Sequence, residues 1–82
     1  MGEQSVDVRA LIEQIAKALV DAPDEVSVEQ IEGETTVFEL TVAPDDIGKV
    51  IGRQGRVVRA LRALVGAAGV RARKRFGLEI IE

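Results

Sequence analysis

The chain has 82 residues, of which 46% are hydrophobic and 30% charged, and its net charge is −3. This composition is typical of one small globular domain and excludes a disordered or fibrous chain, while the lack of cysteine and histidine excludes disulfides, thiolate chemistry and the commonest zinc ligands. With no signal-peptide pattern and no apolar run long enough to span a membrane, we expect a soluble cytoplasmic protein with no membrane insertion, no cofactor and no small-molecule substrate.

The first half of the chain predicts a helix followed by two strands. Residues 6–20 place apolar side chains at helical spacing, with Ser5 as a candidate N-cap and "DAP" as a stop. After this stop the apolar period changes to two, which predicts strands near 25–31 and 35–42. The intervening "EGE" is a glycine turn, so we expect the strands to pair as an antiparallel hairpin.

The second half predicts two helices and a last strand. Asp45 or Asp46 can cap a short helix, and a longer helix follows from Gly55. The longer helix should fray or end within residues 69–73, where the glycines of "GVRARKRFG" loosen the junction. The alternation in "RFGLEII" predicts a final strand over residues 75–81.

This order of elements predicts one α+β domain over residues 1–82. Within the long helix, the apolar residues fall in one sector that should face the core, and Arg56, Arg59 and Arg62 fall in the sector beside it. The apolar sector consists of Val57, Val58, Leu61, Leu64, Val65 and Ala68.

Opposite charges occupy different parts of the chain. Residues 1–46 contain 12 acids and two bases, whereas residues 47–78 contain nine bases and no acid. A polyanion responds to the field within a Debye length of about 8–10 Å, so the basic segment can attract one although the whole chain is acidic. By charge alone, a solvated basic face that complements the acidic half, for instance in self-association, explains this division equally well.

Three glycines interrupt the stretch "DDIGKVIGRQGRVVRALRALV" at 45–65, the core motif of the chain. Their spacing matches neither a Walker A loop nor a dinucleotide fingerprint. What remains is "GRQG" at 52–55 between two helices, where glycine permits unusual backbone angles and the close approach of another backbone. This turn leads into a helix N-terminus, which favours a phosphate. The side chains around it are Lys49, Arg53 and Arg56 and the apolar Ile47, Val50 and Ile51, which can wall a narrow groove.

The segment "IGKVIGRQGR" at 47–56 resembles the signature of the KH domain, an apolar-Ile-Gly-x-x-Gly segment between two helices. The order of elements resembles the type II, or prokaryotic, KH fold, in which a helix and a strand precede a β-α-α-β core and a three-stranded sheet packs on three helices. Nearly the whole chain is similar to the small single-domain bacterial KH proteins called KhpA, above all "VAPDDIGKVIGRQGRVVRALRALV" at 42–65 and the terminal "LEIIE". The segment "GVRARKRFGLEI" is more basic than expected of that family, and its extra arginines should widen the phosphate footprint.

The resemblance implies that the chain clamps about four nucleotides of single-stranded RNA along the turn and an adjoining apolar and basic groove. Its glycines would admit the sugar-phosphate backbone, Arg53 and Gln54 would face that backbone, and the last strand, from Arg75, would offer edge groups to the bases. Gly48 would let the short helix lie close to the bases or to a neighbouring strand. The implied RNA-binding residues are Ile47, Gly48, Lys49, Ile51, Gly52, Arg53, Gln54, Gly55, Arg56, Arg59 and Arg75. Candidates for the apolar floor are Ile47, Val50, Ile51 and Val58, the last three of which fit plain core positions equally well.

The two aromatic residues, Phe38 and Phe76, alternate with other residues in predicted strands and should pack in the core, so we expect weak discrimination between bases and modest affinity. A second KH surface would raise the affinity by effective concentration. The resemblance implies that this surface comes from a larger KH protein called KhpB (also Jag or EloR) or from a homodimer. It also implies an RNA chaperone or post-transcriptional regulator with a part in cell-envelope growth and cell shape.

Rival interpretations are a protein-interaction module, in which the glycine turn is structural and the basic face meets an acidic partner, and a single-stranded DNA binder, since nothing identifies a reader of the 2′-hydroxyl. We do not expect an enzyme. Ser5 and Ser27 have no histidine to activate them, and capping explains the Asp45–Asp46 pair better than catalysis does.

Overall fold

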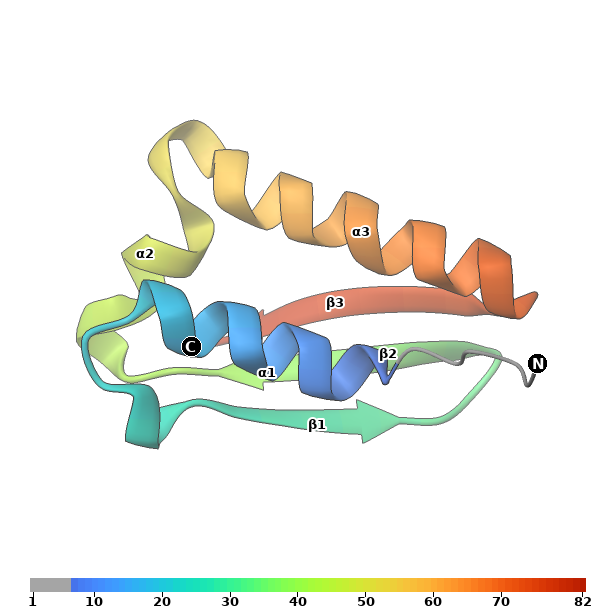
Figure 1. Cartoon of the computed structure of the whole chain (residues 1–82), viewed down its shortest axis with the longest axis horizontal. Helices are drawn as coiled ribbons and strands as arrows, with labels where there is room; N and C mark the ends of the chain where they lie inside the picture. The colour runs from blue at the N-terminus through green and yellow to red at the C-terminus, as the bar shows by residue number, and fades with distance from the viewer. Residues whose placement is uncertain (1–6) are drawn as a thin grey trace, which may run out of the picture.

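The computed structural model describes residues 7–82 and shows helices packed on a mixed sheet (Figure 1). The elements in chain order are α1 (Val8–Leu19), η1 (Pro23–Glu25), β1 (Ser27–Ile31), β2 (Thr35–Thr41), η2 (Pro44–Asp46), α2 (Ile47–Ile51), η3 (Arg53–Gly55), α3 (Arg56–Ala72) and β3 (Arg75–Ile81). This order confirms the α+β class with a three-stranded sheet and three α-helices. The first strand begins two residues later than predicted because Pro23–Glu25 form a 3₁₀ turn.

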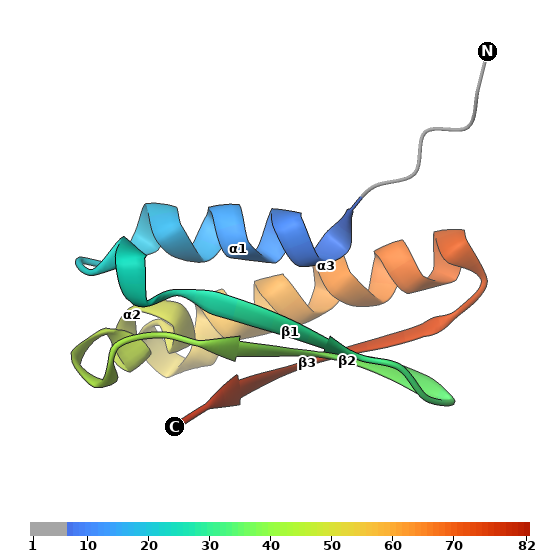
Figure 2. The ribbon, with the colours of Figure 1, turned by 90° about the horizontal axis from the view of Figure 1, so that it is seen from below.

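β2 is the central strand of the sheet, whose order is β1-β2-β3. β1 pairs with β2 in the predicted antiparallel hairpin, and β3 pairs with β2 in parallel, with Leu78 opposite Phe38. The parallel pairing follows because α2 and α3 form the crossover between these two strands. Figure 2 shows α1 and α3 on one side of the sheet and α2 at one end of it. β3 is an edge strand of this sheet, and it packs against α3.

The core lies between the sheet and the helices, and Phe38 is at its centre with 1% of its surface exposed. The Phe38 ring meets Phe76 edge-on, with the ring centroids 5.3 Å apart and the planes at 85°, which is a favoured aromatic geometry. Both rings therefore pack in or against the core, as predicted. The other buried apolar residues are Val8, Ile12, Ala16, Val26, Val28, Leu40, Val42, Val50, Val58, Leu61, Val65 and Leu78.

The face of the sheet away from this core carries a row of three carboxylates. Glu39 of β2 stands opposite Glu29 of β1 and opposite Glu79 of β3. Side chains opposite one another in neighbouring strands are close enough to interact, and like charges in such positions are destabilising. This row places three negative charges on the side of the sheet that the helices leave uncovered.

Two expectations about the long helices concern the N-cap of α1 and the buried side of α3, and the structure differs from both. α1 begins at Val8, and Asp7 is its N-cap because its Oδ1 accepts a hydrogen bond from Ala10 N at 3.1 Å; the predicted cap, Ser5, lies outside the described residues. Leu64 of α3 was expected in the core, yet 54% of it is exposed, because the angle it takes on α3 carries it past the edge of the buried sector. In the part of the chain that the structure describes, no helix is long and apolar enough to cross a membrane.

The junction between α3 and β3 is tight rather than loose. A Cβ added at Gly69 would lie 2.8 Å from Lys74 O and 3.1 Å from Phe76 N, so glycine lets β3 cross close to the helix. α3 ends in a Schellman-type cap, in which Arg73 N donates to Val70 O at 3.1 Å and Lys74 N donates to Gly69 O at 2.8 Å. Arg73 adopts φ 58 there, a left-handed conformation usually taken by glycine.

Candidate functional site

The turn between α2 and α3 has a backbone that only glycine adopts easily. Gly52 has φ 79 and ψ 169, Gln54 has φ 56, and Gly55 has φ 73. Gly52 N donates to Gly48 O at 2.9 Å and closes α2, and Gly55 N donates to Gly52 O at 3.1 Å and closes the turn. The chain therefore reverses within four residues, and α3 starts directly from a left-handed Gly55 with no side chain capping it.

The three glycines of this region have different surroundings. A Cβ at Gly52 would lie 2.5 Å from Val57 Cγ2 and 2.8 Å from Val57 N, so the turn folds back against the first turn of α3. A Cβ at Gly55 would meet nothing closer than 3.6 Å, and one at Gly48 would meet nothing within 4 Å. The space beside Gly48 is open, so no strand of this chain packs against it, and its expected contact with a base stays a prediction.

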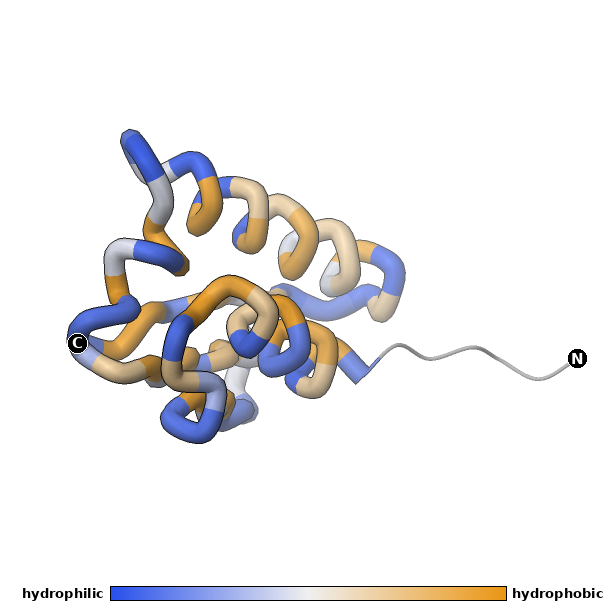
Figure 3. Tube along the Cα trace, turned by 60° about the vertical axis from the view of Figure 1, so that its left-hand side comes forward, coloured by the Kyte–Doolittle hydropathy of each residue, from blue (hydrophilic) through white to orange (hydrophobic). Residues whose placement is uncertain are grey.

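The turn presents cations and a polar side chain to solvent. Arg53, Gln54, Arg56 and Arg59 are all exposed. No carboxylate of residues 7–82 lies within ion-pair distance of these three guanidinium groups. Figure 3 shows the turn as a hydrophilic projection beyond the apolar segments that flank it. An anion that approaches this projection meets positive charge together with the N-terminal end of α3.

The predicted apolar floor divides into two parts. Val50 is fully buried, at 0% exposure, and Val58 is also buried, so both belong to the core. Ile47 and Ile51 are half-buried, and Ile47 packs against the core. Of the four candidates, Ile47 and Ile51 alone keep surface that a base can contact.

The Asp46 side chain connects the start of α2 to the segment that follows α1 by hydrogen bonds. It makes no capping hydrogen bond to α2. Its carboxylate accepts hydrogen bonds from Asp21 N at 3.3 Å and Ala22 N at 3.0 Å, and only 2% of the residue is exposed. Lys49 Nζ lies 3.1 Å from Asp46 Oδ1 and 3.3 Å from Asp21 Oδ2. Sequence reasoning missed these partners because they are 24 and 25 residues away and leave no local pattern.

The Asp46 carboxylate and the Lys49 ammonium stabilise each other's charged forms. Burial by itself would raise the pKa of Asp46, but the hydrogen bonds from Ala22 N, Lys49 and Asp21 N outweigh it and lower that pKa below the usual 3.8. The hydrogen bonds to Asp46 and Asp21 raise the pKa of Lys49. The Lys49 ammonium thus has two carboxylate partners, and its predicted contact with RNA stays a prediction.

The structure separates Arg75 from the other predicted residues. Arg75 begins β3 at the C-terminal end of α3, whereas the glycine turn lies at the N-terminal end (Figure 1). The 17 residues of α3 correspond to about 25 Å at 1.5 Å per residue. The part of β3 near the turn is its C-terminal half, where Arg62 Nε donates to Leu78 O at 3.4 Å. Arg62, which was not among the predicted site residues, therefore connects α3 to β3.

Comparisons with known proteins agree with this geometry. The sequence profile of the family described as "KhpA/KhpB, KH domain" matches residues 9–80. The chain is 52% identical over 75 residues to the RNA-binding protein KhpA of Clostridium acetobutylicum, and this alignment covers 90% of the chain and 100% of that protein. It is 54% identical over 72 residues to the KhpA of Caldanaerobacter subterraneus, covering 87% and 96% of the two chains. For the KhpA of Aquifex aeolicus the identity is 51% over 76 residues, covering 92% and 96%.

A solved structure shows the same fold in a larger protein. The structure of an Aquifex aeolicus Era variant bound to GDP.AlF4- superposes with a TM-score of 0.62 at 15% sequence identity, covering 89% of this chain but 29% of that one. At this identity the likeness concerns the fold alone. The three curated relatives are each named as an RNA-binding protein. From the turn geometry, the order of elements and these matches together, the chain belongs to the KhpA/KhpB family of KH domains.

Proposed function

We propose that the chain works as one KH domain that binds single-stranded RNA at the turn between α2 and α3. The observation that carries this proposal is the exposed pair Arg53–Gln54, held between two positive-φ glycines at the start of α3, with no carboxylate of residues 7–82 within ion-pair distance of Arg53. The relatives named RNA-binding proteins support RNA as the polyanion.

The proposed binding mode has two sides. The sugar-phosphate backbone lies against Arg53, Gln54, Arg56 and the first N–H groups of α3, while about four bases lie over the half-buried Ile47 and Ile51. No aromatic ring is available for stacking because both phenylalanines pack in the core. Affinity in this arrangement comes from phosphate contacts, so it depends strongly on salt and only weakly on base identity.

The open space beside Gly48 provides a sharp test. Gly48→Ala places a methyl group where the protein has no atom within 4 Å, so it should leave the fold intact. In the proposed complex the same methyl group meets the bound strand and should lower the affinity. Fluorescence anisotropy with a labelled oligouridylate would measure this change. Gly66→Ala on α3 is the matched control for an RNA of about four nucleotides, which covers the turn alone, since its added Cβ is equally free of protein contacts but lies away from the turn.

A charge change at the turn tests the phosphate contacts. Arg53→Asp with Gln54→Asp should preserve folding because both side chains are exposed and Asp tolerates the left-handed conformation of residue 54. RNA binding should be lost. Undiminished RNA binding by this variant would contradict the proposal and favour a protein-interaction module in which the turn is structural. Parallel titrations with oligouridylate and oligodeoxythymidylate distinguish RNA from single-stranded DNA.

A partner surface is the second part of the proposal. One short groove with a few phosphate contacts binds weakly, and a second KH surface raises the affinity through effective concentration. We infer either a homodimer or a complex with a KhpB protein, acting together as an RNA chaperone or post-transcriptional regulator. The exposed Leu11 and Leu64, which border a shallow apolar groove between α1 and α3, suit such a contact.

Association of the purified chain should therefore be visible in sedimentation. Leu64→Glu should reduce association without unfolding the chain, because Leu64 is largely exposed. A wild type that stays monomeric at high concentration, alone and with KhpB, would contradict the partner proposal while leaving RNA binding open. Crosslinking in cells, with the Arg53/Gln54 variant as control, would identify the bound RNAs.

A further inference from the structure

Four cations at the junction between α3 and β3 lie outside the site described above. They are Arg71, Arg73, Lys74 and Arg75, here called the basic junction, and all four residues are exposed. No carboxylate of residues 7–82 lies within ion-pair distance of any of them. Their positive charge is therefore not neutralised by contacts within the fold.

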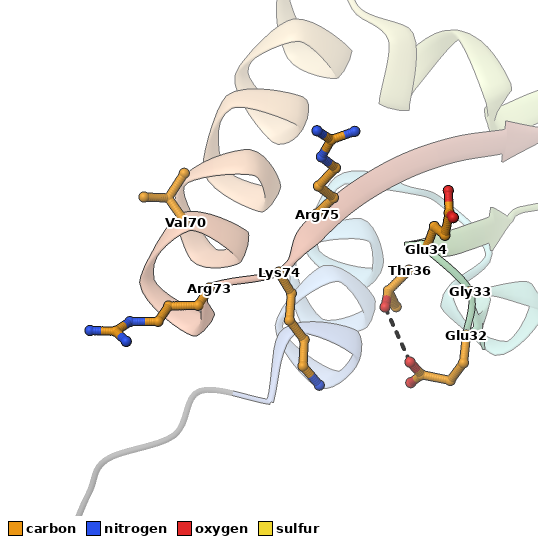
Figure 4. Close-up of a pocket in the computed structure, with 8 residues that line it drawn as sticks. All are labelled: Glu32, Gly33, Glu34, Thr36, Val70, Arg73, Lys74 and Arg75. Atoms are coloured by element: carbon orange, nitrogen blue, oxygen red, sulfur yellow. Dashed lines mark hydrogen bonds between the residues drawn. The ribbon is translucent and has the colours of Figure 1, made fainter.

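The basic junction borders an open cleft of about 410 Å³ whose far wall is the β1–β2 hairpin (Figure 4). Glu32 and Glu34 line that wall, and Glu32 Oε1 accepts a hydrogen bond from Thr36 Oγ1 at 3.1 Å. Figure 4 shows that Arg73 points away from the hairpin and that Lys74 and Arg75 point to opposite sides of β3. Because these cationic side chains point in different directions and lie beside two carboxylates, they cannot surround one small anion. They can each contact a different phosphate of a polyanion that passes over the junction.

The backbone of Arg73 is a second, independent observation. Arg73 occupies the left-handed position that ends α3, with φ 58, where glycine is the usual residue. The helix dipole favours a cation in the last turn, which accounts for Arg71. It does not account for a strained arginine one residue beyond the helix, since a glycine there would relieve the strain. Strain of this kind at an exposed charged residue is typical of functional positions.

No acidic residue belongs to the segment of chain that connects the turn to the basic junction. From residue 47 to residue 78 the sequence contains no acid. The outer side of α3 between its two basic ends is formed by small uncharged residues, among them Ala63, Gly66 and Ala67, and a Cβ at Gly66 would meet nothing within 4 Å. A strand held at the turn can therefore continue along α3.

We propose that the basic junction is a second phosphate-binding surface for the RNA strand held at the turn, so that the bound RNA follows α3 from one end to the other. This inference rests on the proposed function. At about 3.4 Å per nucleotide, the spacing along one strand of a duplex, roughly seven nucleotides cover a separation of about 25 Å, and an extended single strand needs fewer. An RNA of about twelve nucleotides, including the four at the turn, is therefore long enough to reach both ends.

The test compares two RNA lengths in wild type and in a variant of the basic junction. Labelled oligouridylates of about five and about twelve nucleotides are titrated with the wild type and with R71Q/R73Q/K74Q at several salt concentrations. The wild type should bind the longer RNA at least about tenfold more tightly. The variant should lose most of this gain, and its slope of log affinity against log salt should fall by about two, at about 0.7 per lost phosphate contact. Its affinity for the short RNA should not change.

Two single variants with opposite effects sharpen the test. Arg73→Gly relieves the left-handed strain and should raise Tm, yet it should weaken binding of the long RNA. Glu34→Gln removes a carboxylate from the facing wall and should tighten binding of the long RNA. R9Q/K17Q, which removes two cations from α1, is the control and should affect both RNA lengths little.

The outcomes separate this inference from the proposed function. Binding of the short RNA by the turn, with equal affinity for the long RNA or with a length gain that the junction variant retains, would overturn the inference and leave the proposed function standing. In the second case the basic junction would be assigned to a protein partner. Failure of the wild type to bind RNA of either length would overturn both.

Discussion

Replacing the glycines around the turn by alanine should produce three different changes in the free energy of unfolding. At Gly52 the backbone, φ 79 and ψ 169, lies in a region that is almost exclusive to glycine, which costs another residue about 1–3 kcal/mol. The added Cβ would also lie 2.5 Å from Val57 Cγ2 and 2.8 Å from Val57 N, and overpacking of this kind costs about 1–3 kcal/mol. Gly52→Ala should therefore destabilise the fold by roughly 2–6 kcal/mol.

The other two glycines provide internal controls. Gly55→Ala should lower the free energy of unfolding by about 1–2 kcal/mol, the cost of a left-handed backbone for a residue with a Cβ. No steric cost is added, because the nearest atom to the new Cβ is 3.6 Å away. Gly48 is helical and its Cβ position is open, so Gly48→Ala should stabilise by about 0.5–1 kcal/mol. At 0.05–0.15 kcal/mol per residue the 82-residue chain has a total stability of roughly 4–12 kcal/mol. Gly52→Ala alone therefore removes a large part of it.

Urea unfolding followed by far-ultraviolet circular dichroism would measure these differences, provided that the dependence on urea stays the same across the series. Val57→Ala in the Gly52→Ala background should restore part of the loss, since it removes Cγ2 but leaves the backbone N in place. If Gly52→Ala costs no more than Gly55→Ala, the close approach of the turn to α3 is refuted.

Three further predictions concern the core and the charges. Asp46 has a lowered pKa, so its contribution to stability is present above the usual pKa of 3.8 and is lost as the pH falls through the lower pKa of the folded state. Asp46→Asn should therefore reduce the loss of stability at acid pH, measured as the urea midpoint against pH. An unchanged loss would contradict the hydrogen bonds from Asp21 N and Ala22 N to Asp46 as the source of this stability. Phe38→Ala should cost about 3–5 kcal/mol in thermal unfolding, while Leu64→Ala, at an exposed position, should cost far less; equal losses would contradict the core assignment. Glu39→Gln relieves the row of three carboxylates and should stabilise by about 0.2–1 kcal/mol, a gain that high salt should abolish and that urea titrations at two salt concentrations would detect.

Much of the fold could be predicted because its signals are local. The alternation in "RFGLEII" marks β3, and the "EGE" turn specifies the hairpin, because a strand and a tight turn are set by side chains two to four residues apart. The glycine turn was visible for the same reason, since its φ angles need glycine at two fixed positions. Leu64 shows the limit of such patterns. A helical period predicts which side of α3 is apolar, but only the packed neighbours decide where the buried sector ends.

The candidate site depended more on contacts between distant parts of the chain. Asp45 or Asp46 was expected to cap α2, and the position of Asp46 in the sequence fits that role. The fold brings the backbone N–H groups of Asp21 and Ala22 to the same carboxylate, and these bonds take the place of the helix cap. Lys49 follows Asp46 and has its ammonium paired there, although the sequence placed it among the cations of the turn.

The sequence by itself determined the α+β order, the position of the glycine turn and the acid-free basic segment, because each depends on residue type and short spacing. The tertiary structure decided which glycine is locked by close packing and which faces open space, since this depends on Val57 and on the absence of any neighbour at Gly48. It also decided that the cations of the basic segment form two separate groups in space. Arg53 and Arg75 belong to one run of positive charge in the sequence, and the rigid length of α3 holds them apart at opposite ends of the molecule.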